Sequence, residues 1–256
     1  MSTTAAFALV SLRQHLAARG VVIARLVFYA TILLVFSRLW AAVGPRAGLL
    51  PAQFLWYLAI TELVTLSAPF VSSYIEEDVR RGDVAARLAR PVSYLGTRIA
   101  EGLGEMAARF LGLVTMGFLV AWLFAGGLPP HPLSILAAVP LAFLSACLHV
   151  VVQGAVGLSA FWLHEATPLH WVVQKLLFVF GGLLFPLDIY PDWLRTIAMW
   201  TPFSAMVYGP ARLVFGFDGA LFAATLLRLL GWGAAIGLFV WWLNRRALRA
   251  LEVDGG

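Results

Sequence analysis

The chain has 256 residues, of which 61% are hydrophobic and 12% are charged, and its formal net charge is +5. Soluble globular domains contain about 45–50% apolar and about 25% charged residues, so this composition excludes an ordinary water-soluble domain. The mean hydropathy of +0.88 is typical of a protein that is solvated by lipid. The only lysine, Lys175, lies in VVQKLL, so these residues contain no Walker A sequence, whose core is Gly-Lys-Ser/Thr. We therefore expect no ATP hydrolysis by a P-loop of this chain.

Six apolar runs are each about as long as the 17–25 residues that cross a bilayer as a helix. They lie at about 21–43, 54–74, 103–125, 134–162, 171–187 and 219–243. Backbone polar groups cannot stay unpaired in hydrocarbon, and the runs lack the two-residue alternation of barrel strands. The sequence therefore predicts an all-α polytopic membrane protein with six transmembrane helices in a single transmembrane domain, 1–256. Because Lys175 interrupts the fifth run and Pro186 ends its apolar part, this run is expected to be short, tilted or partly re-entrant.

Lysine and arginine residues are distributed unequally between the two predicted membrane faces. Thirteen of the eighteen lie at or near the face that carries both termini, and five lie toward the other face. By the positive-inside rule the face with thirteen is cytoplasmic, so both termini are predicted to be cytoplasmic. The first run is longer than the apolar core of a cleaved signal peptide, about 7–15 residues, and is expected to be retained as a span. The single cysteine, Cys147, has no partner for an intrachain disulfide.

The most charged stretch, EEDVRRGDVAARLAR, follows the second run on the predicted cytoplasmic face. It contains eight charged residues: Glu76, Glu77, Asp78, Arg80, Arg81, Asp83, Arg87 and Arg90. If the helix continues past Tyr74, an acid stands four residues before an arginine three times, which is the favourable order. The three predicted pairs are Glu76–Arg80, Glu77–Arg81 and Asp83–Arg87.

Local signals divide this charged stretch into two short helices. Gly82 is expected to break the first helix, and Asp83 to cap a second one that carries Val84 and Leu88 on one side. Pro91 is expected to stop that second helix. The prediction is an amphipathic helix at the cytoplasmic membrane surface, and the alternative is a solvated loop that only sets the topology.

Intramembrane polar residues are candidates for function. Glu62 lies among apolar neighbours in the second run, where an ionisable side chain is costly. Three roles are open for Glu62: contact with a cationic substrate in a transport path, a neutral hydrogen-bonded acid, or a packing partner of Arg228 in the sixth run. Glu105 and Arg109, four residues apart in the third run, are predicted to form a structural ion pair.

Two histidine-containing segments raise the question of a substrate site or a zinc site. His149 and Gln153 share a face of the fourth run, which favours a helix–helix hydrogen bond over a substrate site. In HEATPLH, His164 and His170 are six residues apart with Pro168 between them, whereas two helical zinc ligands need a spacing of four. The spacing therefore argues against a zinc site, and no Ser/His/Asp set can be recognised.

Prolines punctuate the region between the fifth and sixth runs. They leave room only for short helices at about 192–200 and 204–215, with Gly216 as a stop. Trp193, Ile197 and Trp200 share one face of the first of these helices, as is typical of the outer membrane interface. The alternative is a loop that only anchors the bundle to the headgroups.

Two segments resemble one family. DVRRGDVAARLARPVS (78–93) is similar to the segment between the second and third spans of type-2 ATP-binding-cassette (ABC) exporter permeases, in the bacterial branch with stand-alone membrane subunits. GGLLFPLDIYPDWLRTIAMWTPFSAMVYGPARLVFG (181–216) is similar to the segment that follows the fifth span in that branch, and the closing Gly-Gly (255–256) also fits. The order of the spans agrees with this resemblance.

The resemblance implies a permease subunit, without its own ATPase site, that exports substrate across the bacterial inner membrane. Its charged stretch, Glu76 to Arg90, would be a coupling helix seated on a separate ABC ATPase subunit, which would hold ATP and magnesium, so no cofactor is expected on this chain. The first twenty residues would form an interfacial helix, and the segment after the fifth span an outer lid over the transport path. The lid residues are Asp188, Pro191, Trp193 and Pro202. The implied partners are the ATPase, a second permease of the same or a related kind, and the lipid bilayer, but no nucleic acid.

The sequence leaves two alternative functions open. An ion-coupled secondary transporter would use Glu62, although such folds usually carry broken helices in matching halves. A membrane-embedded enzyme would use His164 and Glu165. The substrate is not specified by any motif.

Overall fold

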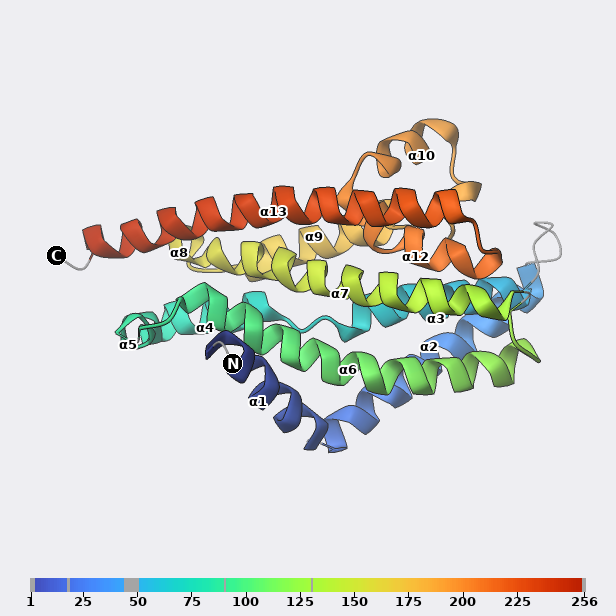
Figure 1. The fold of residues 1–256 in the computed structure, drawn as a ribbon, viewed down its shortest axis with the longest axis horizontal. Helices are drawn as coiled ribbons and strands as arrows, with labels where there is room; N and C mark the ends of the chain where they lie inside the picture. The colour runs from blue at the N-terminus through green and yellow to red at the C-terminus, as the bar shows by residue number, and fades with distance from the viewer. Residues whose placement is uncertain (1–2, 18, 44–50, 90, 130, 255–256) are drawn as a thin grey trace.

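The structure is a computed structural model that describes residues 3–17, 19–43, 51–89, 91–129 and 131–254. Within these residues all regular structure is helical, which confirms the predicted all-α class. Figure 1 shows an elongated bundle whose long helices run side by side along its length. The elements are α1 Thr3–Ala17, α2 Arg19–Val43, α3 Pro51–Ser67, α4 Val71–Arg81, α5 Asp83–Leu88, α6 Tyr94–Ala125, η2 Pro132–Ser134, α7 Ile135–Leu158, α8 Ala160–Leu163, α9 Thr167–Phe180, η3 Leu187–Ile189, α10 Asp192–Met199, α11 Pro202–Met206, α12 Tyr208–Arg212, η4 Leu213–Phe215 and α13 Gly219–Asp254.

Four helical segments of the described chain are long and apolar enough to cross a membrane. They are Ala52–Arg81, Tyr94–Ala125, Pro132–Leu163 and Gly219–Arg249, and they contain the second, third, fourth and sixth predicted runs. The first run lies in α2, which has 25 residues. The fifth run corresponds to α9, whose 14 residues span about 21 Å at 1.5 Å per residue, less than the hydrocarbon thickness of about 30 Å. The fifth run is therefore short, and the count of six spans stays a prediction.

The second predicted span is not one continuous helix. α3 ends at Ser67 and α4 begins at Val71, with Pro69 between them. Proline lacks the backbone N–H and clashes with the preceding turn inside a helix, so the interruption falls where this residue stands. The prediction that the helix runs past Tyr74 is correct, because α4 continues to Arg81.

α3 forms the centre of the core. Apolar residues follow one another around this helix, and Trp56, Tyr57, Ile60 and Leu63 are all almost completely buried. A helix that is apolar on all sides is stable only when it is surrounded, and α3 packs against α2, α6, α7 and α12. Its position places Glu62 inside the bundle, where only 5% of that residue is exposed.

α1 lies against α6 at an angle to the bundle (Figure 1). The two backbones approach closely at Gly104, where an added Cβ atom would be 2.1 Å from the carbonyl oxygen of Ala8. The Ser11 hydroxyl donates a hydrogen bond of 2.7 Å to the backbone oxygen of Glu101. The predicted N-terminal helix is therefore confirmed as a helix, and α6 holds it in place. Its location at the membrane interface stays a prediction.

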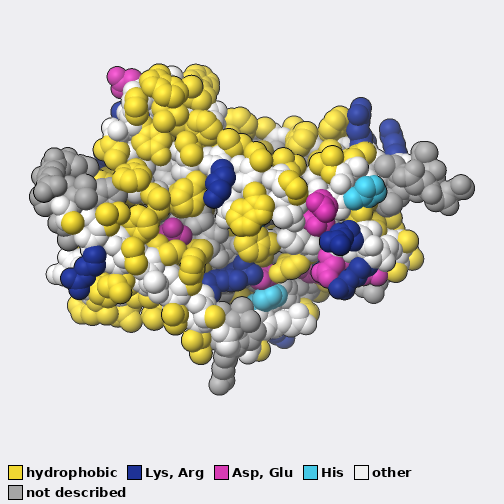
Figure 2. Space-filling model, turned by 180° about the vertical axis from the view of Figure 1, so that it is seen from behind, with side chains coloured by type: hydrophobic (Ala, Val, Ile, Leu, Met, Phe, Trp, Pro, Cys, Tyr) yellow, Lys and Arg dark blue, Asp and Glu magenta, His cyan; other side chains and the backbone are white. Residues whose placement is uncertain are grey.

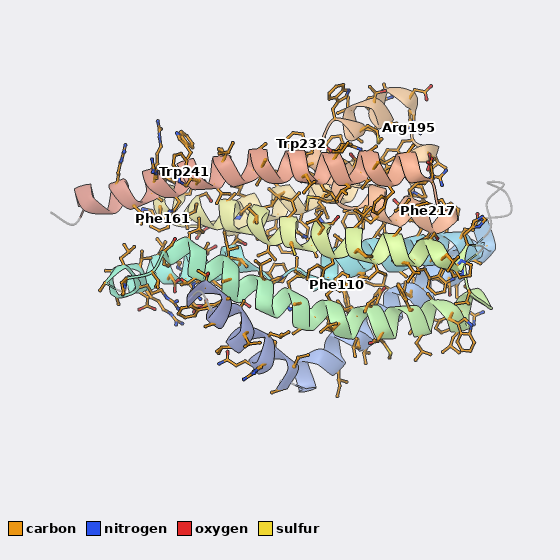
Figure 3. The ribbon with its side chains drawn as sticks, viewed as in Figure 1. Phe110, Phe161, Arg195, Phe217, Trp232 and Trp241 are labelled. Atoms are coloured by element: carbon orange, nitrogen blue, oxygen red, sulfur yellow. The ribbon has the colours of Figure 1, made fainter. Side chains whose placement is uncertain are left out.

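Polar and aromatic residues mark the ends of the bundle. α5, α8 and the last turns of α13 lie at one end, while Phe217 lies toward the other, near the beginning of α13 (Figures 1 and 3). Near the first end, the Arg245 guanidinium stacks 3.9 Å from the centroid of the Trp241 ring, and that of Arg246 lies 4.5 Å from the Trp242 ring. Such Arg–Trp pairs suit a membrane interface, where tryptophan and cationic side chains are enriched. Figure 2 shows hydrophobic side chains over most of one face and charged side chains gathered toward one end.

Candidate functional site

The charged stretch forms the two short helices that the sequence predicts. α4 ends at Arg81, and its C-cap residue is Gly82, whose φ of 74° is left-handed and whose N–H bonds back to the carbonyls of Asp78 and Val79. Glycine takes this conformation without the steric cost that a side chain would impose. α5 begins at Asp83, but its N-cap residue is Gly82 and no side chain caps it. The prediction of Asp83 as the cap is therefore wrong.

The outward side of α4 carries exposed charges. A guanidinium nitrogen of Arg81 lies 2.5 Å from a carboxylate oxygen of Glu77, and Arg80 lies 3.9 Å from Glu76. Both predicted pairs are present. The side chains of Glu77, Arg80 and Arg81 are 53%, 66% and 67% exposed, so they are available to a partner. A pair as exposed as Arg81–Glu77 stabilises the helix by only about 0.3–0.5 kcal/mol.

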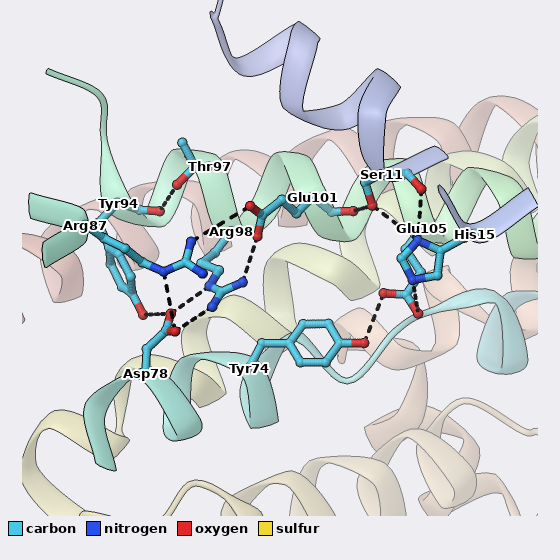
Figure 4. A network of polar contacts seen from close by, with 10 residues as sticks. All are labelled: Ser11, His15, Tyr74, Asp78, Arg87, Tyr94, Thr97, Arg98, Glu101 and Glu105. Carbon is cyan, nitrogen blue, oxygen red and sulfur yellow. Dashed lines mark hydrogen bonds and ion pairs between the residues drawn. The ribbon is translucent and has the colours of Figure 1, made fainter. Parts of the chain in front are cut away.

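Asp78, by contrast, is a buried centre of charge pairs (Figure 4). Arg98 in α6 donates two hydrogen bonds to its carboxylate, of 2.7 and 2.5 Å, and the Tyr94 hydroxyl donates a third of 2.8 Å. Arg87 lies 3.4 Å from the same carboxylate and 3.9 Å from Glu101. The prediction that Arg87 pairs with Asp83 is wrong, because Asp78 and Glu101 hold this guanidinium between α4 and α6.

Glu76 is buried on another side of α4. One of its carboxylate oxygens accepts hydrogen bonds of 3.0 Å from the backbone N–H groups of Ala166 and Thr167, and one of 2.9 Å from the Thr167 hydroxyl. These groups begin α9. Free N–H groups and the helix dipole make a helix N-terminus a favourable site for a carboxylate, so Glu76 joins α4 to α9.

The eight predicted contact residues therefore fall into three groups. Glu77, Arg80, Arg81 and Asp83 are exposed, whereas Glu76 and Asp78 point into the chain and Arg87 is partly buried. Arg90 lies outside the described residues. The roles of Glu76 and Asp78 within the chain could not be predicted from local spacing, because their partners lie in α6 and α9.

A second polar cluster joins α1, α4 and α6. The predicted pair of Glu105 and Arg109 is present. The Tyr74 hydroxyl donates a 3.0 Å hydrogen bond to Glu105, and His15 Nε2 lies 3.3 Å from the same carboxylate. Figure 4 shows that this cluster and the Asp78 cluster lie on successive turns of α6. Together they attach α1 and α4 to one helix.

A cavity of about 550 Å³ lies between α2, α3, α6, α7 and α9, and Glu62 forms part of its wall. The Thr65 hydroxyl donates a 3.3 Å hydrogen bond to the Glu62 carboxylate. Arg228 bonds elsewhere, to the backbone oxygen of Met199 and, at 2.7 Å, to the Ser204 hydroxyl. The hypothesis that Arg228 packs against Glu62 is therefore wrong, while the transport-path hypothesis is compatible with the position of the carboxyl.

Hydrogen bonds along one wall of the cavity connect α4, α7 and α9. The side-chain oxygen of Gln153 accepts a 2.8 Å bond from Ser72, and His170 Nδ1 lies 3.0 Å from the same oxygen. The side-chain nitrogen of Gln153 lies 3.3 Å from His149 Nε2. The predicted helix–helix bond is confirmed. No group of three or more metal-ligating side chains occurs in the part of the chain that the structure describes.

At the far end, Asp188 is the centre of the predicted lid. Arg212 Nε lies 2.9 Å from its carboxylate, Arg195 lies 3.3 Å away, and the Tyr208 hydroxyl donates to both carboxylate oxygens at 3.0 Å. Burial, and the Asp188 carboxylate beside it, raise the pKa of Tyr208 to about 12, so the phenol stays protonated and acts as a donor. Sequence reasoning missed Tyr208 and Arg212, because they lie 20 and 24 residues beyond Asp188 in the chain.

The other lid residues shape the short helices. Pro191 is the N-cap residue of α10, and Pro202 occupies the first turn of α11, where a missing N–H costs nothing. Trp193 and Trp200 are 66% and 81% exposed. They form the exposed apolar face that the spacing of Trp193, Ile197 and Trp200 predicts.

Long apolar helices, an amphipathic pair at one end and short helices at the other define a polytopic helical membrane protein. A model of the family described as "ABC-2 family transporter protein" matches residues 22–253. The chain belongs to this family, which confirms its resemblance to type-2 ABC permeases. A comparison with curated proteins gives no match.

Proposed function

We propose that this chain is the membrane-spanning permease subunit of an ABC export system. It moves substrate out across the bacterial inner membrane while a separate subunit binds ATP and magnesium and hydrolyses the ATP. Family membership supports the permease role over a secondary transporter or a membrane-embedded enzyme. The lack of a Gly-Lys-Ser/Thr core in the sequence supports a separate ATPase. The permease pairs with a second copy or with a related permease to complete the transport unit.

The main support for this proposal is that α4 and α5 expose charges on one side and bond to α6 and α9 on the other. Glu77, Arg80 and Arg81 present charges outward, where they can seat the ATPase. On the inner side, Asp78 holds α6 and Glu76 holds α9 through buried charge-assisted bonds. A displacement of the exposed side would therefore be transmitted to α6 and α9 rather than absorbed by a flexible loop.

The positions of the charged elements indicate which end of the bundle faces the cytoplasm. The charged pair α4–α5 and the cationic end of α13 lie at one end (Figure 1), which we assign to the cytoplasm, and both termini with it. α10, α11 and α12 then lie at the outer face, where Asp188, Pro191, Trp193 and Pro202 form the lid. If the chain crosses the membrane six times, with α2 as the first span and α9 as the fifth, α4 and α5 are cytoplasmic and α10 to α12 are on the outer side.

The experiment that tests this function changes exposed residues of α4 and α5. Arg80 and Arg81 are changed together to glutamate, and in a second variant Ala86→Pro breaks α5, since an internal proline costs about 3 kcal/mol or more. Each variant is co-expressed with an ABC ATPase subunit that the wild-type permease retains on purification. Both should insert normally, yet retain little ATPase on purification and lose substrate-stimulated hydrolysis.

Matched controls separate docking from general charge effects. Changing Arg245 and Arg246 to glutamate makes the same reversal on α13, at the same end of the bundle, and Ala86→Ser keeps α5 helical. Both controls should retain the ATPase. If Ala86→Pro and the Arg80/Arg81 reversal also retain it and transport is normal, α4–α5 is not the coupling element and its charges only set the topology.

A further inference from the structure

The cavity beside Glu62 has the size and walls of a site for a small organic molecule. Its volume of about 550 Å³ falls within the range of about 300–1,000 Å³ that is usual for such sites. Phe28, Phe70 and Phe178 contribute aromatic surface, and Ile32 and Leu66 contribute aliphatic surface. The body of a molecule bound there must therefore be apolar.

Several buried polar atoms in the cavity wall lack hydrogen-bond or ion-pair partners in the described part of the chain. Glu62 is 5% exposed, and no basic side chain of the described residues forms an ion pair with it. Its one side-chain bond comes from Thr65, a neighbour on the same helix. His149 is 6% exposed, and its Nδ1 atom has no hydrogen-bond partner among the described residues. The same holds for the side-chain oxygen of Gln174. Buried polar atoms of this kind are normally satisfied, so they point to a ligand.

The nature of these atoms indicates the chemistry of the ligand. The Glu62 carboxyl and the side-chain oxygen of Gln174 both accept hydrogen bonds, so the matching group is a donor. Aromatic faces attract cations, and three phenylalanines lie in the wall. A protonated amine matches the two acceptors, Glu62 and Gln174, and the aromatic faces, whereas a carboxylate would place one acceptor against two others.

The two arginines of the cavity wall do not reverse this conclusion. Arg109 is paired with Glu105 and donates a 3.1 Å bond to the backbone oxygen of Ala68. Arg25 lies within the electrostatic influence of Glu105 as well as of Arg109. Both arginines therefore belong to the end of the cavity near Glu105, whose single carboxylate offsets part of their charge, while Glu62 forms no ion pair with a basic side chain of the described residues.

We infer that this cavity binds an amphipathic amine, with its apolar body against the phenylalanines and its N–H groups donating to Glu62 and Gln174. That the bound amine is the exported cargo rests on the permease function proposed above. The binding itself does not, because the site lies wholly within one chain. His149, joined through Gln153 to Ser72 in α4, connects the occupied cavity to the proposed coupling element.

The test compares three probes that share one apolar body: 1-pyrenemethylamine, 1-pyrenemethanol and 1-pyrenecarboxylate. Binding to the purified permease in phosphatidylcholine nanodiscs is measured by equilibrium dialysis, with empty nanodiscs subtracted and no ATPase present. The amine should bind most tightly and the carboxylate least. Glu62→Gln and Gln174→Leu should each weaken amine binding, by about tenfold for Glu62→Gln, since a charge-assisted bond is lost. Alcohol binding should change by less than about twofold, and Glu165→Gln, on the exposed surface, should change neither.

Several results would overturn the inference. One is a carboxylate that binds more tightly than the amine, because Arg25 would then govern the site. Another is the absence of binding above empty nanodiscs, and a third is unchanged amine binding in both cavity variants. If Glu62→Gln does not fold, Gln174→Leu alone decides the outcome. Loss of ATPase retention in Ala86→Pro, with no amine binding to the wild type, would refute the ligand class and leave the permease function standing.

Discussion

Asp78 should stabilise the permease more than any exposed charge of the same stretch. Its carboxylate is 4% exposed as a residue and accepts two bonds from Arg98 and one from Tyr94. Removing one partner of a buried ion pair costs about 3–5 kcal/mol. Arg98 keeps Glu101 at 2.7 Å, which offsets part of this cost. Asp78→Ala should therefore lower the free energy of unfolding by about 3 kcal/mol.

The free energy of unfolding is measured by titration with sodium dodecyl sulfate in mixed micelles, with tryptophan fluorescence as the readout. Asp83→Ala is the matched control, because Asp83 is exposed and its change should cost less than about 0.5 kcal/mol. A double-mutant cycle with Arg98→Ala should give a coupling energy of about 1–3 kcal/mol. Equal stability of Asp78→Ala and Asp83→Ala would refute the argument. So would a fully stable Asp78→Ala that loses the ATPase, because the carboxylate would then act on the partner.

Three further outcomes are expected. Glu76→Ala removes the acceptor at the beginning of α9 and should lower the free energy of unfolding by about 1 kcal/mol, as the same titration can show. Gly104→Ala should separate α1 from α6 and make α1 sensitive to protease, since its Cβ would lie 2.1 Å from a backbone oxygen, whereas Gly231→Ala, with nothing within 4 Å, should not. The topology can be tested with single cysteines in a background in which Cys147 is replaced by serine. A cysteine at Ala85 should be labelled only from the cytoplasm, and one at Gly127 only from outside. External labelling at Ala85 would contradict the topology.

Several features of the fold could be predicted from the sequence because they depend on neighbours in the chain. The apolar runs predicted the long helices, because in hydrocarbon a helix pairs the backbone N–H and C=O groups within one segment. The break at Gly82 and the pairs Glu77–Arg81 and Glu105–Arg109 followed from turn chemistry and from the four-residue repeat of a helix. In each case the interacting groups are at most four residues apart.

The site itself depends on contacts between distant segments. Glu76 bonds to Thr167, 91 residues away, and Arg228 bonds to Ser204 rather than to Glu62. Arg87 is placed between α4 and α6 because a buried carboxylate, Asp78, attracts it more strongly than the exposed Asp83 four residues earlier.

Spacing along a helix specifies which side chains share a face, but not which helix lies opposite that face. The packing of α4 against α6, α7 and α9 decides which charges are buried. A charge that loses water must then find its counter-charge or hydrogen-bond donor on the helix beside it. The sequence therefore determined where the charged stretch lies and how it folds locally, and only the tertiary structure decided which of its carboxylates hold the bundle together and which charges face a partner.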